Sequence, residues 1–218
     1  MNQRERKKSR EKSPKKKVQR KKSHDKSPMI KAHHVKSYNV IEIPDFLTHE
    51  ECDLLIQISK TVGLETSLTV GGLNLKHRTS DTIWLKDNDD IVQQISKKVS
   101  VLTNTPITHQ ELLQIVHYNT GGKFKPHYDA DTSDSNDTSD RLSTFLIYLN
   151  DGYKGGDTTF PVINKSVVPK KGKAIYFYNL DKENNKLIYE ALHQGSPVTE
   201  GEKWIANKWI HVSPYVTK

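Results

Sequence analysis

The chain has 218 residues and a net charge of +8, which suits one folded domain with an appendage. Residues 1–36 hold 15 basic and 3 acidic side chains, a net of +12, so residues 37–218 carry −4. The single cysteine, Cys52, excludes an internal disulfide and a cysteine-rich zinc site. We expect Cys52 to be a core thiol on the apolar face of a helix.

Residues 1–36 contain few apolar side chains, which predicts a disordered basic arm. Its two basic clusters, 7–10 and 15–22, are candidates for nuclear import or for contact with nucleic acid or another acidic partner. The N-terminus lacks the apolar segment of a secretory signal, and no apolar run approaches the ~20 residues that span a membrane. We therefore expect an intracellular, soluble protein with no membrane contact, and a nuclear one if the arm acts as an import signal.

Residues 37–218 are expected to form one domain, with helical support in about 37–110. The segment YNVIEIPDF alternates like a strand. Thr48 and Glu51 then match a capping box, which predicts a helix that stops at Gly63. Its apolar face is predicted to contain Cys52, Leu54, Leu55, Ile58 and Val62. A second helix is predicted over Asp89–Leu102, with an apolar stripe of Ile91, Ile95, Val99 and Leu102.

From about residue 111 the sequence changes to strands, and four segments are rich in β-branched and aromatic residues: LLQIVHY, RLSTFLIYL, KAIYFYNL and KWIANKWIHV. Many strands without intervening helices predict a sandwich, a jelly roll or a small barrel. The polar stretch Ala130–Asp140 is expected to be a mobile loop.

His127 and Asp129 are separated by one residue, so on a strand both side chains project from the same face. One imidazole and one carboxylate can then bind the same metal. Two histidines and one carboxylate form the facial triad of non-haem iron sites, which leaves positions open for a co-substrate and oxygen. His-x-Asp alone is weak evidence because such a tripeptide often arises by chance, so the prediction depends on the motifs around it.

Four blocks occur in one order: LLQIVHYNTGGKFKPHYDAD, RLSTFLIYLNDGYKGGDTTFP, VPKKGKAIYFYNL and LHQGSPVTEGEKWIANKWIHV. Together they resemble the catalytic core of the prolyl 4-hydroxylases, and HRTS with Trp84 resembles the block that precedes that core. The resemblance covers Leu112–Val212, about half of the chain. It is closest to the short single-domain type of algae, microbes and viruses. The resemblance implies a mostly β fold with supporting helices around a double-stranded β-helix, a jelly-roll core.

The resemblance also implies the site. The iron ligands would be His127, Asp129 and His193. Lys203 would pair with the distal carboxylate of 2-oxoglutarate, helped by the hydroxyls of Tyr118 and Thr144. The reaction would need Fe(II), 2-oxoglutarate and O2, with ascorbate as the reductant, and would release succinate and CO2.

The implied substrate is a prolyl residue in a proline-rich or collagen-like peptide. The resemblance points to four residues for binding that peptide: Arg78, Ser80, Trp84 and Arg141. Trp209 and His211 are candidate pocket residues, although core packing is the favoured role for Trp209. Two alternatives remain open: a related dioxygenase that acts on another side chain or on nucleic acid, and a non-enzymatic module that binds partners through its basic arm.

Overall fold

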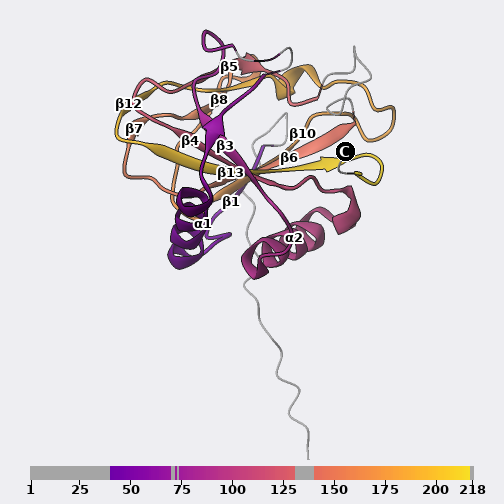
Figure 1. The fold of residues 1–218 in the computed structure, drawn as a ribbon. Helices are drawn as coiled ribbons and strands as arrows, with labels where there is room; N and C mark the ends of the chain where they lie inside the picture. The colour runs from indigo at the N-terminus through magenta and orange to yellow at the C-terminus, as the bar shows by residue number, and fades with distance from the viewer. Residues whose placement is uncertain (1–39, 70–71, 73, 131–139, 217–218) are drawn as a thin grey trace, which may run out of the picture.

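The computed structural model describes residues 40–69, 72, 74–130 and 140–216. In these residues the chain forms two helices, thirteen strands in three sheets and three short 3-10 helices (Figure 1). The predicted basic arm and nearly all of the predicted loop after Asp129 lie outside the described residues.

The main sheet has seven antiparallel strands in the order β1-β10-β6-β13-β4-β3-β2. A second sheet has the order β5-β11-β8-β9, and β12 pairs with β7. The strands are β1 (Ile41–Ile43), β2 (Glu65–Thr66), β3 (Asp81–Leu85), β4 (Leu113–Tyr118), β5 (Phe124–His127), β6 (Arg141–Tyr148), β7 (Lys154–Gly155), β8 (Thr158–Phe160), β9 (Lys165–Val167), β10 (Ala174–Tyr178), β11 (His193–Gly195), β12 (Val198–Glu200) and β13 (Lys203–His211). The helices are α1 (His49–Val62), α2 (Asp90–Thr103), η1 (Ile107–His109), η2 (Pro161–Ile163) and η3 (Tyr189–Ala191).

The two larger sheets face each other, and α1 and α2 cover the far side of the main sheet (Figure 1). One apolar cluster joins the main sheet to the second sheet and includes Val116, Tyr148, Phe160 and Phe177. Another joins the main sheet to the helices. This arrangement confirms the predicted mostly β fold with helical support on one side.

The four segments predicted as strands of the β-rich part are strands β4, β6, β10 and β13. β1 ends before Pro44, where a turn begins, as expected for a segment that ends at a proline, which cannot donate to the sheet; residues 38 and 39 of the predicted segment lie outside the described residues. The part of the chain predicted as helical support also supplies β1, β2 and β3 to the main sheet.

Local signals placed the first helix correctly. Thr48 Oγ1 accepts a hydrogen bond from the Glu51 amide at 3.1 Å, and the Thr48 amide donates to Glu51 Oε2 at 2.8 Å. These two bonds satisfy amides that the first turn leaves free. Gly63 ends the helix with φ of +100°, a conformation that favours glycine. Cys52 is fully buried in this helix, as predicted.

The predicted apolar faces were partly wrong. Leu54, Val62 and Leu102 are 44, 67 and 44% exposed, respectively. Ser59 takes a buried position in α1, and its hydroxyl donates to the Leu55 carbonyl at 2.8 Å. A serine that bonds its own helix satisfies its polar group, so burial does not follow the apolar pattern alone.

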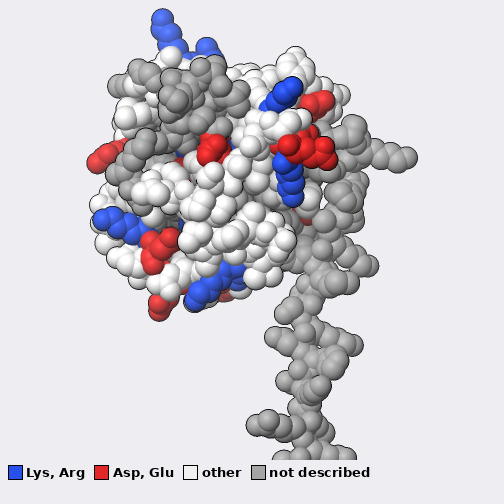
Figure 2. Space-filling view, turned by 90° about the vertical axis from the view of Figure 1, so that its right-hand side faces the viewer, with Lys and Arg blue, Asp and Glu red and all other residues white. Residues whose placement is uncertain are grey.

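No helix of the described part is both long enough and apolar enough to cross a membrane. On the face drawn in Figure 2, lysine and arginine side chains alternate with aspartate and glutamate rather than forming a patch of one sign. This fits the sequence, in which the excess positive charge belongs to residues 1–36.

Candidate metal centre

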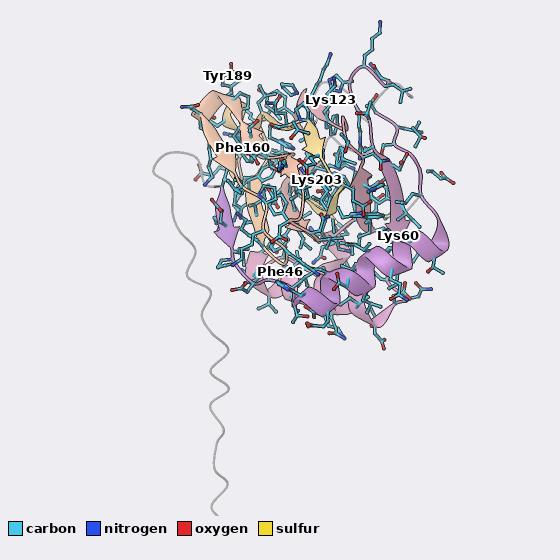
Figure 3. The ribbon with its side chains drawn as sticks, turned by 90° about the vertical axis from the view of Figure 1, so that its left-hand side faces the viewer. Phe46, Lys60, Lys123, Phe160, Tyr189 and Lys203 are labelled. Carbon is cyan, nitrogen blue, oxygen red and sulfur yellow. The ribbon has the colours of Figure 1, made fainter. Side chains whose placement is uncertain are left out.

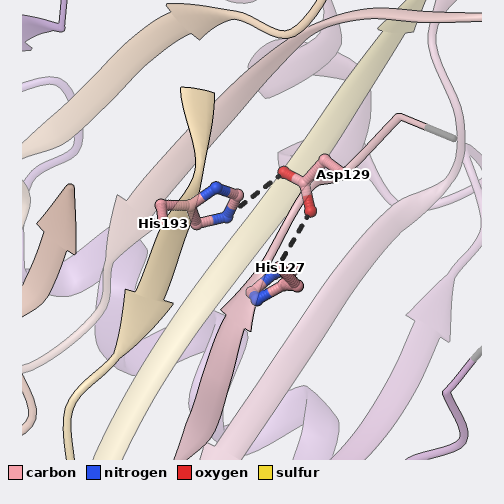
Figure 4. Close-up of side chains that lie close together, drawn as sticks. All are labelled: His127, Asp129 and His193. Carbon is pink, nitrogen blue, oxygen red and sulfur yellow. Dashed lines mark ion pairs between the residues drawn. The ribbon is translucent and has the colours of Figure 1, made fainter. Parts of the chain in front are cut away.

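The second sheet brings two distant histidines together. β5 ends at His127 and β11 begins at His193, and these residues are directly opposite each other in the antiparallel pair. Asp129 follows in the bend after β5, so it is not on the strand itself as the sequence pattern suggested. Even so, its carboxylate turns back toward both rings (Figure 4).

The three side chains form a compact set of ligand atoms, all within 4.8 Å of one another. His127 Nε2 lies 3.5 Å from Asp129 Oδ1, and His193 Nε2 lies 3.6 Å from Asp129 Oδ2. Asp129 and His193 are buried, whereas His127 is half-buried. One ion can therefore bind three protein ligands on one side, with its other side open to the pocket.

The hydrogen bonds of the two rings fix which nitrogen faces the metal. His127 Nδ1 lies 2.8 Å from the Lys125 carbonyl, and His193 Nδ1 lies 2.9 Å from the Ala191 carbonyl. Because a carbonyl only accepts, each Nδ1 must carry the proton, which leaves each Nε2 lone pair free for a metal. Burial lowers the pKa of His193 to about 4, so this ring is neutral near pH 7 and suited to a metal.

Asp129 is held as a carboxylate. Burial alone would raise its pKa, but its attraction to the protonated forms of His193 and His127 and to Arg141 outweighs burial and holds the pKa well below its usual range. The Thr144 hydroxyl donates to Asp129 Oδ2 at 2.6 Å. The structure thus places Thr144 against a metal ligand, whereas we had predicted it on 2-oxoglutarate; it does not line the pocket. These donors, two imidazoles and one carboxylate, fit Fe(II).

A narrow pocket extends from the triad to Lys203, which lies in the interior between the sheets, whereas Lys60 and Lys123 lie at the periphery (Figure 3). Lys203 is 2% exposed, and its ammonium donates to the Gly156 carbonyl at 2.6 Å. Burial lowers its pKa to about 8. An ammonium has three N–H donors, so this buried cation can still donate hydrogen bonds to an anionic group that enters the pocket.

Two side chains with hydroxyl groups, Tyr118 and Thr158, line the same pocket as Lys203. Its nitrogen lies 5.5 Å from the centre of the Tyr118 ring, and Tyr118 is buried in the pocket wall. Thr158 also lines this pocket, is 2% exposed and accepts a hydrogen bond from the Tyr148 hydroxyl at 2.8 Å. Thr158 was not predicted as a site residue, although it belongs to the segment GGDTTFP, which resembles the family.

Two predicted peptide-binding residues lie at the pocket wall. Arg78 and Ser80 are 8 and 7% exposed, and Arg78 Nε donates to the Ser80 hydroxyl at 2.8 Å. The Arg78 guanidinium carbon lies 4.9 Å from the centre of the Phe124 ring, which stacks on His127 at 3.6 Å. Arg78 therefore lines the pocket, and Ser80 supports it from behind.

On the other side of the triad, Arg141 belongs to a buried ionic network. Its guanidinium donates to both oxygens of Glu111 at 2.5 and 2.9 Å, and His211 Nε2 lies 2.7 Å from Glu111 Oε1. Burial would raise the pKa of Glu111, but its bonds with His211 and Arg141 lower it. No pattern in the sequence pointed to Glu111, because its hydrogen-bond partners are 30 and 100 positions away.

Trp209 lies between Arg141 and Trp84. The Arg141 guanidinium carbon is 3.8 Å from the centre of the Trp209 ring, and the two tryptophan rings are 5.7 Å apart. Trp209 is 5% exposed and lines the metal pocket, whereas Trp84 is 39% exposed. Arg141, Trp209 and Trp84 therefore form a continuous surface beside the metal ligands.

A jelly-roll core with two histidines and one aspartate at the mouth of a pocket, and a buried lysine within it, defines the Fe(II)- and 2-oxoglutarate-dependent oxygenases. The family model of the 2OG-Fe(II) oxygenase superfamily matches residues 113–211. Prolyl 4-hydroxylase 5 of Arabidopsis thaliana is 34% identical over 78% of this chain and 67% of its own length. Prolyl 4-hydroxylase subunit alpha-1 of Mus musculus is 32% identical over 79% of this chain but only 34% of its own length.

A solved structure supports the same relationship. The viral collagen prolyl hydroxylase from Paramecium Bursaria Chlorella virus-1, in its 2OG complex, is 33% identical and covers 82% of this chain and 98% of its own, with a TM-score of 0.67. The chain belongs to the prolyl 4-hydroxylase family of the 2OG-Fe(II) oxygenases. It is accordingly a dioxygenase that uses iron, 2-oxoglutarate and O2.

Proposed function

We propose that this protein hydroxylates prolyl residues in a proline-rich or collagen-like peptide, forming 4-hydroxyproline. The observation that carries the proposal is the set of His127, Asp129 and His193 beside the buried Lys203, in a chain related to prolyl 4-hydroxylases. When bound, iron with 2-oxoglutarate and O2 supplies the oxidant that converts a C–H bond to C–OH, with succinate and CO2 as the other products.

Each group of side chains has its own task in this proposal. His127, Asp129 and His193 hold the iron, and Lys203 binds the distal carboxylate of 2-oxoglutarate, assisted by Tyr118. The pocket is lined by apolar as well as polar side chains, which keeps water from the reacting bond. No side-chain base is required, so the protein acts by orienting the substrate.

The peptide would lie over the exposed edge of the site. Trp84, which is 39% exposed, offers a flat aromatic face next to the pocket-lining Trp209, which the Arg141 guanidinium also contacts. Proline-rich chains in the polyproline II conformation bind aromatic-lined grooves. Arg78 would form the opposite wall, held from behind by Ser80. This favours a peptide over a small metabolite as the substrate.

The test is mass spectrometry of proline-rich peptides after incubation with the purified protein, Fe(II), ascorbate and 2-oxoglutarate. We expect a gain of one oxygen on proline, with matching succinate. His127→Ala should abolish both, whereas His49→Ala, which alters an exposed histidine of α1, should not. Turnover of nucleic acid but of no peptide would overturn the choice of substrate, and full activity of His127→Ala would overturn the site.

We propose that the basic arm, residues 1–36, binds an acidic partner. Its role is either contact with nucleic acid or nuclear import, and one deletion can distinguish the two. The support is its net charge of +12. Removal of residues 1–36 should weaken binding to DNA or RNA with a steep salt dependence if nucleic acid is the partner. If only nuclear accumulation in cells is lost, the arm is an import signal.

A further inference from the structure

Strand β10 supports the metal ligands although it contributes none of the three. In the register between β10 and β6, Phe177 is the partner of Thr144. The Phe177 ring lies 5.0 Å from the His193 ring, edge-on at 66°. Asn179 comes directly after β10, and its side chain donates a hydrogen bond to Thr144. The end of β10 therefore contacts one ligand directly and reaches a second through a threonine.

Asn179 is fully buried and is held at both backbone groups. Its amide donates to the Leu142 carbonyl at 2.8 Å, and its carbonyl accepts from the Ile188 amide at 2.9 Å. The side-chain nitrogen Nδ2 lies 2.9 Å from Thr144 Oγ1, which in turn lies 2.6 Å from Asp129 Oδ2. These two bonds form a short chain that begins in the core and ends at a metal ligand.

The direction of both bonds follows from the number of protons available. A threonine hydroxyl has one proton, and a carboxylate only accepts hydrogen bonds. Thr144 must therefore give its proton to the bond with Asp129, so the Asn179 side chain must be the donor in the other bond. This places the NH2 group of Asn179 toward Thr144 and its oxygen Oδ1 away from it.

The same orientation leaves the Asn179 oxygen in an unfavourable place. Oδ1 is buried and has no hydrogen-bond partner within the part of the chain that the structure describes. A buried polar atom without a partner is unfavourable for stability, and an apolar side chain of similar size would avoid it. Stability therefore does not explain an asparagine at this position, whereas the hydrogen bond that it donates to Thr144 does.

We propose that Asn179 is a positioning residue for iron, acting through Thr144 on Asp129. The Asn179 amide occupies a lone pair of the Thr144 hydroxyl and so keeps the hydroxyl proton on Asp129 Oδ2. The carboxylate then stays turned toward both histidine rings (Figure 4). Groups that orient a metal ligand in this way strengthen metal binding. The inference rests on the iron ligands of the proposed function, but it does not depend on the substrate.

Asn179→Leu tests this role, because leucine has a similar size, donates no hydrogen bond and leaves no polar atom unpaired. The Kd for Fe(II), titrated without oxygen, should rise about three- to tenfold, which is less than the effect expected for a direct partner of the ligand. Without metal, the midpoint of urea unfolding should stay the same or rise, because the unpaired oxygen is gone. A purely structural role predicts a lower midpoint and an unchanged Kd.

Two further variants separate an action through Thr144 from other effects. When Asn179→Leu is added to Thr144→Val, the Kd for Fe(II) should change little further, because the hydroxyl that Asn179 orients is already absent. Ser59→Ala is the matched control, since it removes one hydrogen bond of a fully buried side chain in α1. Its Kd for Fe(II) should equal that of the wild-type protein.

A wild-type Kd for Fe(II) in Asn179→Leu overturns the role of Asn179, and so does an effect that adds fully to that of Thr144→Val. Asn179→Ala, a smaller change, provides the same comparison if the leucine variant does not fold. If His127→Ala binds Fe(II) as tightly as the wild-type protein, the iron ligands of the proposed function are wrong. If only His127→Ala weakens binding, those ligands stand and the role of Asn179 alone fails.

Discussion

Lys203 offers the sharpest prediction, because its replacement by methionine should stabilise the protein while weakening its co-substrate binding. The ammonium is 2% exposed and has one hydrogen bond, to Gly156. Burial lowers its pKa from the usual 10.5 to about 8, which corresponds to about 3 kcal/mol of unfavourable free energy for the charged form near neutral pH. Lys203→Met removes that charge and keeps the length of the side chain, so the free energy of unfolding should rise by about 1–3 kcal/mol.

The same substitution removes the partner of the distal carboxylate. Truncating one side of a buried charge pair costs about 2–5 kcal/mol, so the Kd for 2-oxoglutarate should rise about 30-fold or more. Urea unfolding of the protein without metal or 2-oxoglutarate measures the stability. Calorimetric titration of the Fe(II)-loaded protein without oxygen measures the affinity.

Lys208 provides the matched control. It lies five residues further along β13 on the opposite face, is 0% exposed, and has its pKa lowered by burial. Its nitrogen lies 3.5 Å from Asp87, a side chain that is 42% exposed and can return to water. Lys208→Met should therefore change stability little or raise it, with the affinity for 2-oxoglutarate unchanged. A less stable Lys203→Met protein, or one with normal affinity, would refute the reasoning.

Three other changes have separate expected outcomes. Above about pH 8 Lys203 loses its proton in the folded protein, whereas a lysine in the unfolded chain keeps its proton up to about pH 10.5. The affinity for 2-oxoglutarate should therefore fall, by up to about tenfold per pH unit, while the contribution of Lys203 to the free energy of unfolding rises. Titrations of 2-oxoglutarate at pH 7, 8 and 9 check this, and an affinity that does not change with pH contradicts it. Thr144→Val removes the 2.6 Å hydrogen bond to Asp129 and should weaken iron binding about tenfold, with little change in the KM for 2-oxoglutarate. A metal titration and a KM measurement separate this support of Asp129 from the predicted contact of Thr144 with 2-oxoglutarate. Glu111→Gln leaves Arg141 buried without its carboxylate and should lower the free energy of unfolding by about 3 kcal/mol in urea, and a loss below about 1 kcal/mol would argue against the network.

The elements that the sequence predicted well depend on neighbours in the chain. A capping box needs two residues three apart, and a strand needs a run of β-branched and aromatic side chains. Both signals are complete within a few positions, so α1, β4 and β13 were found with nearly correct bounds. The faces of the helices were less predictable, because burial of Ser59 and exposure of Leu54 depend on which part of the helix the sheet covers.

The residues of the functional site were likewise predictable only in part. The order of the sequence blocks was enough to propose His127, Asp129, His193 and Lys203, and the structure brings the first three together at one end of the pocket that contains Lys203. The contacts that support them were not predictable. They depend on the register between β5 and β11 and on the bend that brings the Asp129 carboxylate to the hydroxyl of Thr144 on β6, and neither can be read from the local sequence.

β13 connects the fold to the chemistry, because its two faces serve different purposes. Lys203, Ile205, Asn207 and Trp209 line the pocket, while the intervening Trp204, Ala206, Lys208 and Ile210 are buried on the opposite face of the same strand. β13 also pairs on both sides, with β4 and β6, so its backbone is fixed by hydrogen bonds along nearly its whole length. A pocket built on such a strand holds its lysine and its aromatic surface at a constant separation. This constant separation orients the co-substrate and the substrate relative to each other.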